Sequence, residues 1–361
     1  MDRPDRSRRR HPCRLRARLR AIARRCRLSP RGFRWIAVVA TVFVAVVIVS
    51  GGAVRLTESG LGCPSWPNCE PGSLGPRAAS DSHAMVEFVN RIFTGLISAA
   101  VIAAVLGSLL RNPRRRDLVW LSLGLVGGVV GQIVLGGITV LTDLHPGAVM
   151  SHFLLSIVLL TDAIVLCVRA GYRDDAVTRR VVPRAVLRYT LLLTLVASVV
   201  VVTGTVVTNT GPHAGDREAK RFDLTLPQVA RVHGTSVVVF LVLVLLGLWL
   251  ARRAGALEHL QSRFTMLLGA VVAQGAIGYW QYFTGVPALL VGIHLAGATL
   301  VWSATLLLLL GCYEPTQLPA EPRARANPRP GLRRPGEGAR SCAGPPSSPN
   351  ASNAASARRW P

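Results

Sequence analysis

The stretch GQIVLGGITVLTDLHPGAVMSH, from Gly131 to His152, returns in a looser copy as AQGAIGYWQYFTGVPALLVGIH, from Ala273 to His294. In each copy a glutamine is followed four residues later by a glycine and twenty residues later by a histidine: Gln132, Gly136 and His152, then Gln274, Gly278 and His294. Repetition at a fixed spacing is the sequence signature of a duplicated structural unit. The chain is therefore predicted to contain an internal duplication.

The register of this duplication extends backwards from both glutamines. Asn90, in VEFVNR, lies 42 residues before Gln132, and His233, in VARVHG, lies 41 residues before Gln274. Each predicted half thus has a polar or histidine position in one apolar segment and a histidine in another.

Composition places the chain in a membrane. Half of the 361 residues are hydrophobic and 17% are charged, and the apolar residues form runs too long for a soluble core. The formal charge of +24 does not indicate a nucleic-acid-binding protein, because the basic residues are concentrated in the tails and in alternate loops. We expect an all-α polytopic membrane protein that binds no nucleic acid.

Eight segments are long enough to span a bilayer, which takes ~20 apolar residues. They lie at about 33–54, 84–110, 117–142, 147–169, 185–208, 227–251, 262–284 and 288–312. With the duplication, they predict two pseudo-symmetric four-helix bundles, an N-terminal half at 33–169 and a C-terminal half at 185–312. Residues 1–32 are predicted to be a basic, disordered arm attracted to membrane lipid, and residues 313–361 a disordered tail.

Arginine distribution sets the expected orientation. The connections at 111–117, 169–188 and 252–263 hold four, six and three arginines, whereas those at 142–146 and 285–287 hold no Lys or Arg. Positive loops stay on the inner side of a membrane. Both termini are therefore predicted to face the cytoplasm, with the protein in the cell membrane.

Four landmark residues share one predicted depth. Asn90, His152, His233 and His294 each lie about six residues into a span that begins at the outer surface, which is ~9 Å of helix rise. A histidine inside a membrane marks a functional site unless it only packs between helices. For three histidines and an asparagine at matched depth, metal ligation is favoured over packing. Haem fits better than zinc, because no cysteine or carboxylate cluster accompanies the histidines.

Several outer residues extend this hypothesis. Glu87 shares a helix face with Asn90 and Arg91, so it is either a structural partner of Arg91 or a proton-handling group; Ala230 stands at its position in the second half. His145 is expected to stabilise its loop or line an entrance. Cations near the outer face are expected to hold haem propionates: Arg55, Arg91, Arg217, Lys220, Arg221 and Arg231.

Two cysteines lie in the first outer loop, within GLGCPSWPNC. An outward location favours a disulfide or a redox-active thiol pair for Cys63 and Cys69. The alternative is a purely structural link across a short loop.

Six strings resemble the haem A synthase family across residues 33–312: GGAVRLTESGLGCPSWPNC, VEFVNR, HPGAVMSHFLLS, TGTVVTNTGPHAGD, VARVHG and GIHLAGA. The resemblance implies an oxidoreductase that converts the C8 methyl of haem O to a formyl group by two successive hydroxylations. It also implies a haem b cofactor between His233 and His294 and the substrate haem against His152. The family's acid matches Glu87, and its cysteine pair matches Cys63 and Cys69.

Two departures from the family stand out. Many members carry a histidine where this chain has Asn90, and a cysteine pair that some members carry is missing between Asn209 and Leu226. Implied partners are haem O synthase and cytochrome oxidase assembly proteins, and a homo-oligomer remains open. The rival interpretations are a diheme b-type membrane electron-transfer protein and a transporter built on a repeat.

Overall fold

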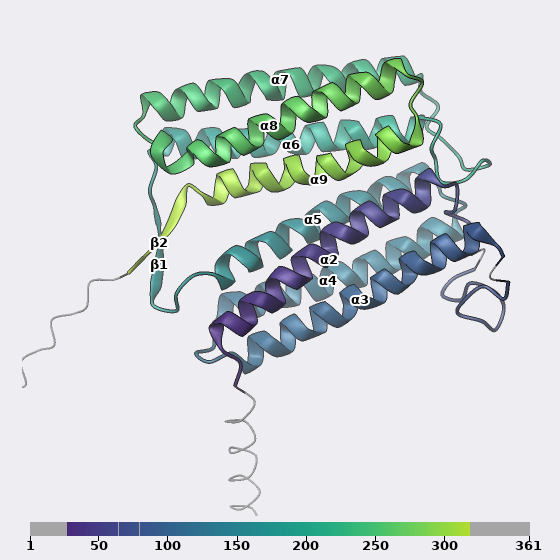
Figure 1. Ribbon diagram of the computed structural model, residues 1–361, viewed down its shortest axis with the longest axis horizontal. Helices are drawn as coiled ribbons and strands as arrows, with labels where there is room; N and C mark the ends of the chain where they lie inside the picture. The colour runs from purple at the N-terminus through teal and green to yellow at the C-terminus, as the bar shows by residue number, and fades with distance from the viewer. Residues whose placement is uncertain (1–26, 64, 79, 318–361) are drawn as a thin grey trace, which may run out of the picture. The chain divides into compact units, whose positions relative to one another are not determined.

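The computed structural model describes residues 27–63, 65–78 and 80–317. Most of them lie in eight long helices: α2 (Pro30–Leu56), α3 (Ser82–Leu110), α4 (Arg116–Leu141), α5 (Pro146–Ala170), α6 (Arg184–Thr210), α7 (Leu226–Arg253), α8 (Leu257–Phe283) and α9 (Ala288–Leu310). Helices α2 to α5 pack on one another, and so do α6 to α9 (Figure 1). Helices α2 and α5 contact α9 where the two groups meet. Residues 1–26 of the predicted arm and the predicted tail beyond residue 317 lie outside the described residues. The prediction of a disordered arm up to residue 32 is wrong for residues 30–32, which form the start of α2.

Seven of these helices, all but α8, are long and apolar enough to cross a membrane. The prediction of an all-α polytopic membrane protein is confirmed. Helix α8 is less apolar, because polar residues such as Gln261, Arg263 and Gln274 interrupt its apolar residues. Large apolar side chains such as Trp120 and Leu195 are exposed on the outer faces of the helices, where lipid replaces water as the solvent.

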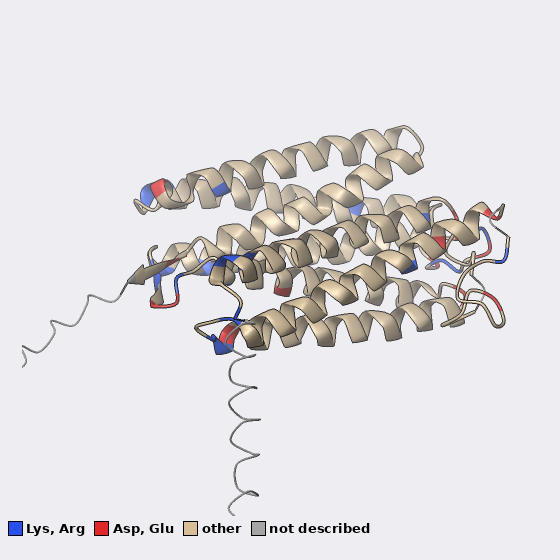
Figure 2. Ribbon diagram, turned by 60° about the horizontal axis from the view of Figure 1, so that its bottom comes forward, with Lys and Arg blue, Asp and Glu red and all other residues tan. Residues whose placement is uncertain are grey.

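Charged residues gather mainly at the two ends of the helices (Figure 2). Three of the eight helix starts, those of α2, α3 and α5, are capped by a local side chain. Asp81 accepts hydrogen bonds from the backbone N–H groups of His83 and Ala84 at the start of α3. His145 caps α5, since its Nδ1 accepts from the N–H of Gly147 at 3.2 Å. Of its two expected roles, His145 therefore serves the first, stabilising its loop.

A short pair of antiparallel strands was not predicted. Strand β1 (Ala176–Arg180) pairs with β2 (Tyr313–Gln317), with Ala176 opposite Gln317. The prediction of a disordered tail from residue 313 is therefore wrong for residues 313–317. The backbone partner of this segment lies far away in the sequence, so composition alone does not reveal it.

The two helix groups interlock at the end that carries the loops after α2 and α6. The N–H of Gly60 donates to the carbonyl of Gly215 at 2.8 Å, and Arg217 pairs with Glu58 at 2.9 Å. Between the groups, α2 approaches α9 closely: a Cβ on Gly52 would lie 2.8 Å from a methyl carbon of Leu295. A side chain at residue 52 would therefore require Leu295 to shift.

Candidate functional site

His233 on α7 and His294 on α9 face each other inside the second helix group. Their ring centroids are 6.4 Å apart and their ring planes are nearly perpendicular, at 87°. Nδ1 of His233 is 3.1 Å from the hydroxyl of Thr203 on α6. Nδ1 of His294 is buried and has no hydrogen-bond partner among the described residues.

Two imidazoles on α7 and α9 at this separation are a donor set that would suit a haem iron. The buried Nδ1 of His294 without a hydrogen-bond partner is a polar group that calls for an explanation. The apolar helices around the rings suit a porphyrin plane.

Glycines make room for all three histidine rings. A Cβ on Gly204 would lie 3.1 Å from Cε1 of His233, and one on Gly278 would lie 3.2 Å from Cε1 of His294. In the first group, a Cβ on Gly136 would lie 3.3 Å from Cε1 of His152. The glycine of the duplicated motif is thus explained by the ring that packs against it.

The glutamine of the motif has a different task in each copy. Gln132 donates to the carbonyl of His152 at 3.1 Å and to the hydroxyl of Ser156 at 2.9 Å, which ties α4 to α5. Gln274 packs directly against Gly297. His152 itself has a buried Nδ1 with no hydrogen-bond partner in the described part of the chain.

Asn90 occupies the position that corresponds to His233. Its Oδ1 accepts a hydrogen bond of 2.8 Å from the hydroxyl of Ser50 on α2, much as Thr203 contacts His233. A Cβ on Gly51, the residue after Ser50, would meet nothing within 4 Å. A cavity of about 280 Å³ opens beside it, lined by Ser50, Asn90 and the apolar residues Ala53, Val54, Met85, Val86, Val89 and Phe93.

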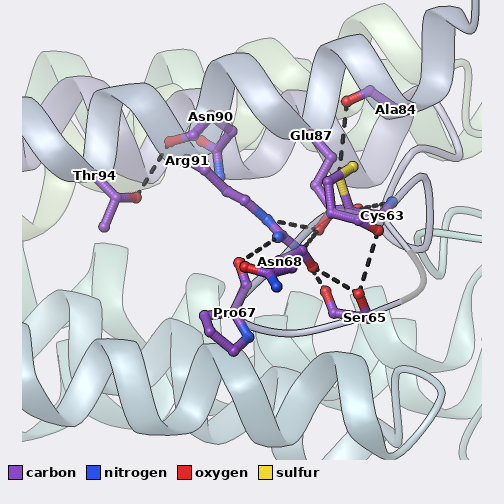
Figure 3. A network of polar contacts seen from close by, with 10 residues as sticks. Cys63, Ser65, Pro67, Asn68, Ala84, Glu87, Asn90, Arg91 and Thr94 are labelled. Carbon is purple, nitrogen blue, oxygen red and sulfur yellow. Dashed lines mark hydrogen bonds and ion pairs between the residues drawn. A yellow bond between two sulfur atoms is a disulfide. The ribbon is translucent and has the colours of Figure 1, made fainter. Parts of the chain in front are cut away.

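Glu87 is 6% exposed, and donors contact both of its oxygens (Figure 3). Oε1 accepts from Arg91 at 2.6 Å, and Oε2 accepts from the backbone N–H of Cys63 at 2.8 Å. Arg91 also donates to the carbonyls of Ser65 and Pro67. The expected contact with Arg91 is therefore present, and it extends to a loop contact that the spacing does not reveal.

That loop is closed by a disulfide between Cys63 and Cys69, whose Cα atoms are 4.3 Å apart. Trp66, inside the loop, packs on Gly137 of α4, where a Cβ would lie 3.0 Å from the indole. A Cβ on Gly62 would lie 2.5 Å from the backbone of His83, so only glycine fits there. The loop therefore rests on both α3 and α4.

The other residues singled out in the sequence, His83 and the outer cations, contact different groups of the protein. His83 contacts the hydroxyl of Ser59 at 3.0 Å. Of the cations expected to hold propionates, Arg91 and Arg217 are engaged in ion pairs with carboxylates.

Sequence reasoning missed Asp162, whose buried Oδ2 lies against Gly124 without a hydrogen-bond partner among the described residues. Its only sequence signal is an acid in the middle of an apolar segment.

The fold defines a polytopic membrane protein, and the histidine pair lies inside its second helix group. Residues 34–214, half of the chain, match the COX15-CtaA family of cytochrome oxidase assembly proteins, and the chain belongs to that family.

Individual relatives of the chain are consistent with this family assignment. The chain is 28% identical over 186 residues to a heme A synthase of Lysinibacillus sphaericus (strain C3-41), covering 50% of this chain and 59% of that protein. It is 26% identical over 316 residues to a heme A synthase of Caulobacter sp. (strain K31), covering 74% of this chain and 92% of the relative. It spans less than two thirds of the Lysinibacillus protein.

Proposed function

We propose that this protein is a haem A synthase, an oxidoreductase that converts the C8 methyl of haem O to a formyl group by two successive hydroxylations for cytochrome oxidase biogenesis. The observation that carries the proposal is the facing pair of His233 and His294, 6.4 Å between centroids, in a member of the cytochrome oxidase assembly family. The rival diheme electron carrier across the membrane would favour haems at two depths.

The proposed architecture is two pseudo-symmetric four-helix halves, 33–169 and 185–312, with α8 as the eighth span. The matched contacts of Gly136 with His152 and of Gly278 with His294 support this symmetry. Arginine-rich connections at 111–117, 169–188 and 252–263 support cytoplasmic termini and a place in the cell membrane.

The proposed cofactor is haem b, held by His233 and His294, which supplies one-electron chemistry when bound. Thr203 orients the ring of His233 through its contact with Nδ1. Haem O is the proposed substrate, held by His152 in the first half with Asn90 and Arg91 nearby. Glu87 either carries a proton or positions the substrate, because it is buried and held on both oxygens. Haem O synthase and cytochrome oxidase assembly proteins are proposed partners.

The test is to express the chain in cells with and without a supply of haem O, extract the pigments and analyse them by mass. Haem A that appears only when both the chain and haem O are present supports the function. Haem O left unchanged in cells that contain folded, haem-loaded protein would refute it.

A further inference from the structure

Three buried polar atoms without a hydrogen-bond partner lie along the interface of α8 and α9. Among the described residues, six buried side-chain nitrogen or oxygen atoms lack such a partner, and three of them are Oε1 of Gln274, Oε1 of Gln281 and Nδ1 of His294. Gly278, which packs on the ring of His294, lies between the two glutamines on α8. Residues seven apart share a helix face, so both amides lie on the side of α8 that carries Gly278.

The two glutamines lie at different levels of this interface. Gln274 packs on Gly297, one helical turn beyond His294 on α9. Helical side chains lean toward the N-terminus of their own helix, so Gln281 leans back toward Gly278 and Gln274 leans away from it. On the antiparallel α9, His294 leans toward the end of α8, and therefore toward Gln281. Gln281 is thus the glutamine that can reach the ring of His294.

The other histidine of the pair already has the contact that His294 lacks. The hydroxyl of Thr203 donates to the carbonyls of Val199 and Val200, both at 3.0 Å. Its single hydrogen is therefore not available to Nδ1 of His233, which lies 3.1 Å away. Nδ1 of His233 carries the hydrogen and donates it to Thr203, which leaves the lone pair of Nε2 for a metal. A histidine that binds a metal almost always donates its other N–H to an acceptor in this way.

We propose that Gln281 is the positioning residue of His294: its Oε1 accepts a hydrogen bond from Nδ1–H, directly or through one ordered water, and increases the electron donation of the ring to the haem iron. The inference rests on the proposed function. This contact satisfies two buried polar atoms at once, each of which is costly to leave unpaired.

This acceptor belongs to the second half alone. In the register of the duplication, Thr139 stands at the position of Gln281. Its hydroxyl donates to the carbonyl of Leu135, one turn earlier on the same helix, at 2.7 Å. The proposed contact therefore distinguishes the cofactor histidine His294 from His152 in the first half.

The experiment measures the reduction potential of full-length protein loaded with iron protoporphyrin IX in detergent, by absorbance during a redox titration. Gln281→Leu removes the acceptor and leaves a side chain of similar size. The ring then donates less charge, which destabilises ferric relative to ferrous iron. We expect the preference for ferric iron to fall about tenfold, which raises the potential by about 59 mV. Gln281→Met, of equal length, repeats the test if the leucine variant does not fold.

Three further variants separate this role from packing. Thr203→Val removes the acceptor of His233, so it should raise the potential by a similar amount and sets the scale. Gln281→Glu keeps an acceptor, so its potential should stay at or below the wild-type value. Gln274→Leu is the matched control, because it removes a buried amide from the same face of α8, and it should leave the potential unchanged.

An unchanged potential in Gln281→Leu, or an equal rise in Gln281→Glu, would overturn the role of Gln281 and leave the histidine site standing. A rise in Gln274→Leu that matches the rise in Gln281→Leu would assign the shift to lost packing, and would overturn it as well. If wild type forms no low-spin haem complex, the haem site of the proposed function fails, and the role of Gln281 fails with it.

Discussion

The backbone N–H of Cys63 donates a 2.8 Å hydrogen bond to the buried carboxylate of Glu87. The disulfide-bonded loop thus holds this carboxylate from one side, and Arg91 holds it from the other. Because Arg91 also donates to the carbonyls of Ser65 and Pro67, the loop, the acid and the arginine form one connected network (Figure 3).

Glu87→Gln is expected to lower haem A formation roughly 100-fold, the usual effect of removing a proton-transfer group. The amide keeps an oxygen that can accept from Cys63 N–H, so folding and haem content should be retained. The product is measured by mass analysis of extracted pigments, with the haem spectrum as the check on folding. Turnover equal to wild type would leave Glu87 as only a structural partner of Arg91.

Cys63 and Cys69 should be isolated as a disulfide when the protein is purified without reductant. Intact-mass analysis after alkylation should find neither residue labelled, while Cys167 on α5, a free thiol, serves as the internal control. Replacing both by serine is expected to lower the melting temperature, because the disulfide contributes about 2 kcal/mol to the free energy of unfolding. Two alkylated cysteines at 63 and 69 would contradict a resting disulfide.

His233→Ala and His294→Ala should each abolish the low-spin haem b spectrum of the purified protein, because each imidazole is proposed to supply one axial bond. Absorbance and electron paramagnetic resonance spectra measure this loss. His259→Ala is the control and should have no effect, because His259 lies in the first turn of α8 with its side chain exposed. Both variants keeping the wild-type spectrum would show that the ligands are elsewhere.

Gly278→Ala should disturb haem binding, because its Cβ would lie 3.2 Å from the ring of His294. Gly275→Ala, one turn earlier on α8, meets nothing within 4 Å and is the matched control. Alanine favours a helix over glycine by about 1 kcal/mol, so both variants should fold. We expect a broadened or weakened low-spin band for Gly278→Ala alone, and identical spectra for the two variants would refute this role of the glycine.

Asn90→His should convert the haem O complex from largely high-spin to low-spin and slow product formation. An amide is a poor axial ligand, so His152 is expected to leave one position on the substrate iron open to oxygen. The cavity of about 280 Å³ that Asn90 lines offers room for the new ring. Spectra of the haem O complex of wild type, Asn90→His, His83→Ala and His145→Ala decide the question: a low-spin wild type that turns high-spin on loss of His83 or His145 would reject the open position.

The sequence predicted features that depend on a fixed spacing. In each copy of the Gln–Gly–His pattern the glycine and the histidine pack together, although they lie on neighbouring helices. The Glu87–Arg91 contact followed from the spacing along one helix. Contacts made through backbone atoms were missed, since carbonyls such as that of Thr208 carry no residue signature. The β1–β2 pair was missed for a related reason, because each strand has its only partner in a distant segment.

The pairing of β1 with β2 joins the two ends of the second helix group. The chain enters α6 from β1 and leaves α9 into β2, so the entry and the exit of these four helices lie side by side. A cut in the connection at 171–175 would therefore leave β1 and β2 paired, because both strands lie after the cut. The two groups could then be made as separate polypeptides and reassembled, with the Gly60–Gly215 and Glu58–Arg217 contacts and the α2–α9 packing to align them.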